Sequence, residues 1–79
     1  MTGLGSKLLD ASKRDYQGQL AKLFANLEIL CNHPVGIGEH TDIVGEVQKC
    51  IESIHDYEGF IQVIENIEKQ VKQNHASMN

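Results

Sequence analysis

The stretch that decides the fold is DIVGEVQKCIESIHDYEGFIQVIENIEKQVKQ, residues 42–73. Apolar residues return in it at alternating steps of four and three, the spacing that keeps one face of an α-helix apolar. These seam residues are Ile43, Val47, Cys50, Ile54, Tyr57, Ile61 and Ile64, with Val71 following later. The spacing predicts one helix over residues 42–73, about 45 Å long at about 1.5 Å per residue.

A second helix is predicted over residues 7–31, because the same rhythm appears there. Its seam consists of Tyr16, Leu20, Leu23, Leu27 and Leu30. Phe24 and Cys31 widen this stripe on one side. Ser12, three residues before Asp15, fits a capping box, so the helix is expected to begin at Lys7 or at Ser12.

Glycine and the chain ends mark the other boundaries. Gly18 lies inside the first helix, weakens it by about 1 kcal/mol relative to alanine, and can mark a bend. Residues 1–6 hold two glycines and no periodicity, so we expect a flexible arm there. Residues 74–79 lack apolar periodicity and are expected to form a frayed tail.

The segment 32–41 breaks the helical pattern and is predicted to be a turn. Pro34 disfavours helix at the residue before it, and Gly36 and Gly38 permit positive φ. Thr41 is expected to be the N-cap of the next helix, with the Asp42 carboxylate near its positive end. The fold class is therefore an all-α, antiparallel two-helix hairpin, with a possible bend in the N-terminal helix.

The long helix carries more apolar surface than one neighbour covers. A further apolar set lies beside its seam: Val44, Ile51, Phe60, Val63 and Ile67. A stripe of that length is rarely left exposed on a monomer. A chain of 79 residues also has too small a core to be very stable alone. We therefore expect one small domain that assembles into a homo-oligomeric helical bundle or ring.

Composition excludes some classes of partner. The net charge of −4, with only seven lysines and arginines, argues against binding a long nucleic acid. No run of 18 or more apolar residues predicts a membrane span. Cys31 and Cys50 form no C-x-x-C pair, and no apolar leader is recognised, so we expect reduced thiols and a cytoplasmic location, in the host cell if the chain is viral.

The turn is the best candidate for a binding site. Gly36 and Gly38 allow backbone N–H groups to point outward, next to the positive end of a helix, an arrangement that binds phosphate. G-x-G is not a Walker loop, and Glu39 and Asp42 repel phosphate unless they accept hydrogen bonds from a base instead. A turn held only by capping groups explains the same residues.

Metal binding and catalysis are the competing readings of the turn. His33, His40 and Cys31 are ligand types that zinc accepts, but their spacing matches no zinc pattern. Cys31 and His33 also suggest a thiol with a base, yet neighbours in sequence seldom face each other and a hairpin encloses no deep pocket. We therefore expect no metal, no cofactor and no enzymatic activity.

Outside the turn, Tyr16 and Lys13 form a second candidate. The tyrosine ring can stack on a base while the lysine holds a phosphate. Packing of Tyr16 in the apolar seam of the helix explains its position equally well.

The stretch CNHPVGIGEH, residues 31–40, resembles a turn in small uncharacterised helical-hairpin proteins of tailed bacteriophages. The resemblance covers the turn and the following helix through about Gln70. Similar phage hairpins include sponges that sequester cyclic-nucleotide or ADP-ribose immune signals in rings, with the ligand between protomers. The tyrosine and lysine that the best-known sponges use have no assigned positions here, which leaves the ligand open.

The resemblance implies an anti-defence protein that binds a nucleotide-derived second messenger, a cyclic nucleotide or an ADP-ribose-type molecule, without cleaving it. The predicted ligand-binding residues are Lys13, Tyr16, Asn32, His33, Pro34, Gly36, Gly38, Glu39, His40, Thr41 and Asp42. The alternative is a protein–protein interaction module, or an accessory of virion assembly, that acts through an exposed apolar helix face.

Overall fold

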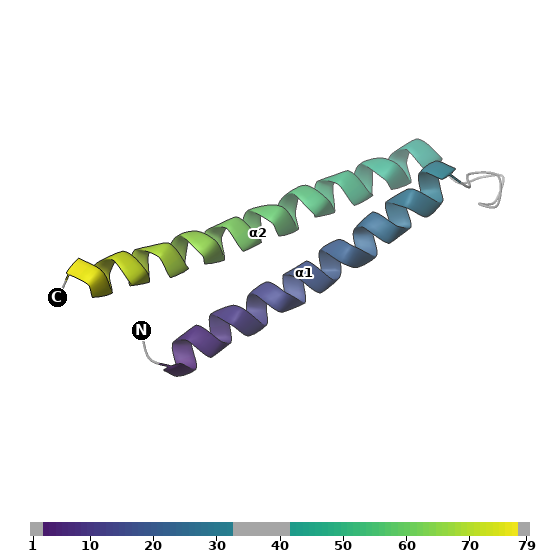
Figure 1. Cartoon of the computed structure of the whole chain (residues 1–79). Helices are drawn as coiled ribbons and strands as arrows, with labels where there is room; N and C mark the ends of the chain where they lie inside the picture. The colour runs from purple at the N-terminus through teal and green to yellow at the C-terminus, as the bar shows by residue number, and fades with distance from the viewer. Residues whose placement is uncertain (1–2, 33–41, 78–79) are drawn as a thin grey trace.

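The computed structural model describes residues 3–32 and 42–77, with side chains described as far as Gln73. Helix α1, Gly3–Asn32, and helix α2, Ile43–Ser77, lie side by side and antiparallel, with both chain ends at the same end of the hairpin (Figure 1). This confirms the prediction of an all-α two-helix hairpin. We refer to the end that holds the chain termini as the open end and to the other as the turn end.

Both helices extend further than the sequence patterns indicated. α1 begins at Gly3, inside the predicted arm, and runs unbroken through Gly18. α2 continues to Ser77, through residues that we expected to fray. The predicted cap at Ser12 is wrong, because its hydroxyl donates to the Leu8 carbonyl oxygen at 2.9 Å from inside the helix. The helix interior satisfies the backbone, so no cap is needed there.

The N-cap of α2 is Asp42, whereas the sequence suggested Thr41. Asp42 Oδ1 accepts a hydrogen bond from the Gly45 N–H at 3.0 Å. The Asp42 carbonyl oxygen accepts one from the Glu46 N–H, also at 3.0 Å. These two bonds begin the helix, and the carboxylate lies where the helix dipole favours negative charge. Thr41 itself lies outside the described residues.

The two seams meet as predicted. Every predicted seam residue is buried or half-buried. Ile54 and Ile64, at 9% and 6% exposure, are the two apolar residues that count as buried in the part of the chain the structure describes. The alternating steps also continue beyond the predicted seam, to Lys13 and Leu9 on α1 and to Glu68 on α2, all half-buried.

The further apolar set does not form a single stripe, which corrects the expectation. Val44 and Ile51 come one residue after a seam position, whereas Phe60, Val63 and Ile67 come one residue before one. In antiparallel helices, residues that follow seam positions share one flank of the pair and residues that precede them share the other. We call these the following flank and the preceding flank. Each flank therefore has its own exposed apolar residues.

The single hairpin is elongated and exposes more surface to solvent than a compact protein of its size. Its dimensions are 63 × 17 × 16 Å and its radius of gyration is 18.0 Å, whereas a compact chain of this length has about 12 Å. Its accessible surface is 6189 Å², against about 4,800 Å² expected for a compact protein of this mass. Within the described residues, neither helix is long and apolar enough to span a membrane.

Candidate functional site

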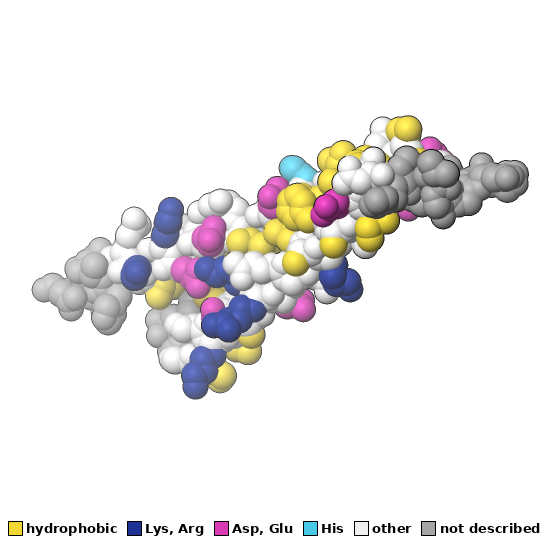
Figure 2. All heavy atoms as spheres, turned by 45° about the vertical axis from the view of Figure 1, so that its right-hand side comes forward, with side chains coloured by type: hydrophobic (Ala, Val, Ile, Leu, Met, Phe, Trp, Pro, Cys, Tyr) yellow, Lys and Arg dark blue, Asp and Glu magenta, His cyan; other side chains and the backbone are white. Residues whose placement is uncertain are grey.

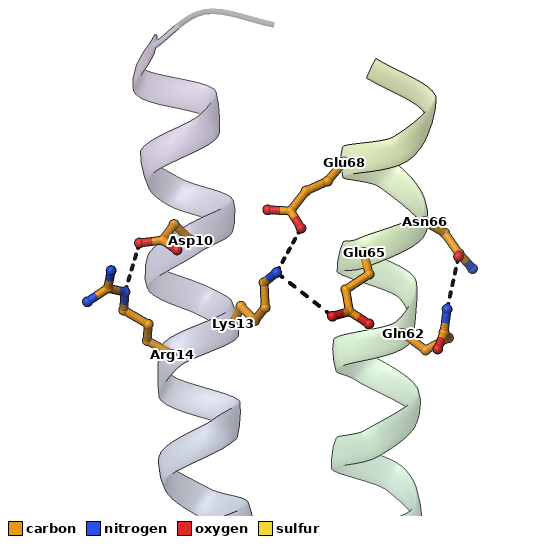
Figure 3. A network of polar contacts seen from close by, with 7 residues as sticks. All are labelled: Asp10, Lys13, Arg14, Gln62, Glu65, Asn66 and Glu68. Atoms are coloured by element: carbon orange, nitrogen blue, oxygen red, sulfur yellow. Dashed lines mark hydrogen bonds and ion pairs between the residues drawn. The ribbon is translucent and has the colours of Figure 1, made fainter. Parts of the chain in front are cut away.

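An ion pair occupies the seam near the open end. Lys13 Nζ donates a hydrogen bond to Glu68 Oε1 at 2.9 Å and lies 4.0 Å from Glu65 Oε2 (Figure 3). The Lys13 side chain is 21% exposed, so it is held between the helices rather than in open water. Opposite charges at facing seam positions satisfy each other there, where apolar residues would otherwise meet.

Lys13 is electrostatically tied to α2. Its hydrogen bond to Glu68 raises the pKa of the Lys13 ammonium above its usual value, and the charges of Glu68, Glu65 and Asp10 add to this against the effect of partial burial. Both glutamates turn towards Lys13 and form no ion pair with Lys69 or Lys72, although four-residue spacing on one helix allows such pairs. The cross-helix contact displaced the local ones.

A groove of about 870 Å³ opens beside this ion pair on the following flank. We call it the open-end groove. Its floor includes Leu9 and Val71, and its walls are polar. The residues that line it are Ser6, Leu9, Lys13, Gln62, Glu65, Glu68, Lys69, Val71 and Lys72. Lys69 and Lys72 form no ion pair within 4.0 Å among the described residues, so their charges remain available.

The preceding flank carries an aromatic cluster and an apolar hollow at the same end. The ring centroid of Tyr16 lies 5.6 Å from that of Tyr57 and 5.2 Å from that of Phe60. A shallow hollow of about 280 Å³ lies beside them, lined by Leu9, Ser12, Tyr16, Phe60, Val63 and Ile64. Three exposed apolar residues on this flank form what we call the open-end patch: Phe60 and Val63, which line the hollow, and Leu8, which precedes Leu9 in the chain. Their exposures are 44%, 56% and 61%.

A second apolar surface, the turn-end patch, lies on the following flank near the turn. It comprises Phe24, Cys31, Val44 and Ile51, each one residue after a seam position and each exposed. Phe24 and Ile51 are 50% and 53% exposed. In Figure 2, hydrophobic side chains gather over the half of the hairpin next to the turn, while most lysine and arginine side chains on that face lie over the other half.

The predicted ligand-binding residues fall into two groups. Lys13 belongs to the ion pair and the open-end groove, and Tyr16 to the aromatic cluster. Asn32 ends α1 and Asp42 caps α2, both at the turn end. The remaining predicted residues lie outside the described part of the chain: His33, Pro34, Gly36, Gly38, Glu39, His40 and Thr41.

One copy of the hairpin does not bring these two groups together. Tyr16 lies sixteen residues before Asn32 on a continuous helix, which is a separation of about 24 Å along the axis. A ligand of nucleotide size cannot touch both within one chain. Any site that combines Lys13 or Tyr16 with Asn32 or Asp42 therefore needs residues from two copies.

The described segments contain no group of side chains arranged to bind a metal ion. No group of three or more histidine, cysteine, aspartate or glutamate side chains is placed there to hold a metal ion. Cys31 is exposed and Cys50 half-buried, and both are free thiols. His33 and His40, which the metal hypothesis also used, lie outside the described residues.

The sequence reasoning missed the two glutamates that hold Lys13 and the groove beside them. A readable signal existed, because the steps of four and three, continued past Tyr16 and Ile64, reach Lys13 and Glu68. Opposite charges at two seam positions of an antiparallel hairpin indicate that they face each other. The groove itself had no such signal.

Comparison of this chain with protein-family models, with curated proteins and with solved structures finds no match. The resemblance to phage hairpin proteins therefore stays a prediction, and the function is argued from the residues alone.

Proposed function

We propose that this protein is a protein–protein interaction module that docks an amphipathic helix of a partner on the open-end patch. The observation that carries the proposal is the shallow apolar hollow on the preceding flank, lined by Phe60 and Val63, with Leu8 exposed on the same flank. A hollow between two helices that accepts one or two apolar side chains is the usual seat for the anchors of a third helix. The proposed mode of action is association without catalysis.

Selection of helical peptides from a displayed library, followed by titration, tests this proposal. Peptides recovered on the wild-type chain should carry apolar residues at helical spacing. Val63→Asp should weaken their binding at least about tenfold, equivalent to about 1.4 kcal/mol, because it places a charge at the hollow. Val44→Asp is the matched control, because Val44 is also an exposed valine, at 67% against 56% for Val63, and lies on the opposite flank. Peptides that bind Val63→Asp as well as wild type would contradict the proposal.

A second proposal follows from the resemblance: sequestration, without cleavage, of a cyclic-nucleotide or ADP-ribose-type messenger. The open-end groove supports it, because Lys13, Lys69 and Lys72 lie together there, and two of them lack a carboxylate partner among the described residues. Phosphate recognition by clustered lysines needs such free charges.

Calorimetry with a panel of cyclic di- and trinucleotides and cyclic ADP-ribose isomers tests sequestration. Binding should release or absorb heat, raise the melting temperature and weaken when Lys69 and Lys72 are both changed to glutamine. Lys22→Gln is the control, because Lys22 lies in the turn half of α1 and does not line the groove. Absence of heat and of any melting shift with every member would end this proposal.

A further inference from the structure

The following flank has two unlike halves. Its turn half carries the exposed turn-end patch, and its open half carries the open-end groove. Both features belong to the same flank, because the patch residues and the groove residues Gln62, Glu65, Lys69 and Lys72 all follow seam positions on continuous helices. One half presents apolar side chains outward and the other is hollowed.

The charges on this flank are also divided. In the turn half, the charged residues that follow seam positions are Glu28 and Glu58, both acidic. In the open half, four such residues are basic, namely Lys7, Arg14, Lys69 and Lys72, and two, Asp10 and Glu65, are acidic. The turn half of the flank is therefore negative and the open half positive. Glu28 and Glu58 have no ion pair among the described residues.

We propose that a second copy of this chain docks antiparallel on the following flank, with the turn-end patch of each copy seated over the open-end groove of the other. In this antiparallel dimer, the acidic half of each copy faces the basic half of the other, so the favourable charge contact is made twice. The apolar floor of Leu9 and Val71 then meets Phe24 and Ile51 of the other copy. A two-fold pair of this kind is a four-helix bundle.

The area available fits this occupant. The chain exposes 6189 Å², about 1,400 Å² more than a compact protein of its mass. A standard protein–protein interface covers about 800 Å² on each partner. The excess surface of one hairpin is therefore sufficient for a stable pair. The open-end patch lies on the preceding flank and stays free, so pairing leaves the helix-docking surface of the proposed function available.

A small anion in the same groove is the competing occupant. Glu65 and Glu68 line the groove with the lysines, which favours a partner that offers apolar groups as well as carboxylates. The two occupants exclude each other, because a docked copy covers Lys69 and Lys72. Messenger binding at these lysines that is as strong in the dimer as in the monomer would show that no second copy covers them, and it would overturn the docking proposal.

Zero-length carbodiimide crosslinking of the full chain, with sedimentation at micromolar concentration, tests the pair. Glu28 should crosslink to Lys7, Lys69 or Lys72. Within one chain, Glu28 lies 21 residues from Lys7 on one helix, which is about 31 Å. Lys69 and Lys72 follow Glu68, which contacts Lys13. Glu28 lies fifteen residues from Lys13 towards the turn end, a separation of about 22 Å along α1. Such crosslinks therefore arise only between copies.

Substitutions separate this inference from the proposed function. Ile51→Asp should shift the sedimenting species from dimer to monomer without loss of helix content, whereas Val63→Asp should leave the dimer intact and lose only helix docking. Changing Glu28 and Glu58 to lysine should dissociate the pair, and adding Lys69→Glu and Lys72→Glu should restore it. A wild-type chain that stays monomeric, or a dimer that Ile51→Asp leaves unchanged, would overturn the proposal.

Discussion

The two halves of the hairpin solve the same packing problem with different chemistry. In the turn half, the seam is apolar throughout, from Leu20 to Leu30 on α1 and from Ile43 to Tyr57 on α2. In the open half, the Lys13–Glu68 pair replaces two apolar seam residues, and a groove opens beside it. In the turn half, apolar side chains fill the space between the helices. In the open half, the Lys13–Glu68 pair fixes how the two helices are aligned and leaves the open-end groove beside it.

The comparison suggests a division of roles. Polar groups in a helix seam can specify alignment at some expense of stability. Here the pair fixes which residue of α1 faces which residue of α2 at the end where no turn joins them. Each half contributes one of the two buried isoleucines among the described residues, Ile54 in the turn half and Ile64 in the open half. Four predictions test this division of roles.

The largest effect is expected at the two buried isoleucines. Ile54→Ala in the turn half and Ile64→Ala in the open half should each destabilise the chain by about 2–5 kcal/mol, the usual range for removing a buried isoleucine side chain. Their exposures are similar, 9% and 6%, so similar losses are expected. Urea unfolding followed by circular dichroism measures both. A loss at Ile64 far smaller than at Ile54 would mean that the open half contributes little to the core.

Changes to the Lys13–Glu68 pair should have an intermediate effect on stability. The change should be a loss when only Lys13 is replaced and a recovery when both residues are replaced. Lys13→Leu alone leaves Glu68 in the seam without its cation and should lower stability. Lys13→Leu with Glu68→Leu should recover or exceed wild-type stability, because two apolar residues then fill the seam. Thermal melts of the single and double variants measure this. A double variant that is less stable than the single one would show that the pair contributes more than alignment.

The pH dependence of the same pair follows from the pKa of Lys13. That pKa is raised above its usual value of 10.5, with the hydrogen bond to Glu68 as the largest cause. Its contribution is therefore complete at pH values well below 10.5 and is lost as the pH rises through the higher folded value. The stability difference between wild type and the Lys13→Leu, Glu68→Leu variant should stay flat from pH 7 to 9 and change only in more alkaline solution.

The smallest effects are expected at two exposed glycines, one on each helix near the middle of the hairpin. A Cβ at Gly18 or at Gly59 meets no atom within 4 Å, and neither residue has a positive φ. Alanine should therefore stabilise each helix by about 0.5–1 kcal/mol. Equal gains at both sites would show that neither helix needs its glycine for packing. Destabilisation at either glycine would reveal a close partner at that surface in the assembled protein.

Much of the fold was predictable because helix periodicity is a local property. The alternating steps identified both helices, their pairing and every seam residue from Tyr16 to Leu30 and from Ile43 to Ile64. The Asp10–Arg14 ion pair, at 2.8 Å, was likewise a matter of spacing on one helix. Helix ends were predicted less well, because α1 extends back to Gly3 and α2 on to Ser77 through residues such as glycine, serine and asparagine that have low helix propensity.

The candidate site was less predictable, because it depends on contacts between the helices. Glu65 and Glu68 have lysines four residues further along their own helix, a spacing that favours local ion pairs. The structure turns both glutamates to Lys13 instead, since the packed register places a half-buried cation within reach. Among the described residues, Lys69 and Lys72 are therefore left beside the groove without an ion pair. The predicted residues of the turn stay predictions.

By itself, the sequence determined that this chain forms two amphipathic helices joined by a turn, because the apolar period depends only on residues three and four positions apart. Only the tertiary structure decided which flank each remaining apolar residue occupies and which carboxylates Lys13 binds. The physical reason is that flank and partner depend on how two helices are rotated and aligned against each other. That alignment is set by all of the seam contacts together and by no single stretch of the chain.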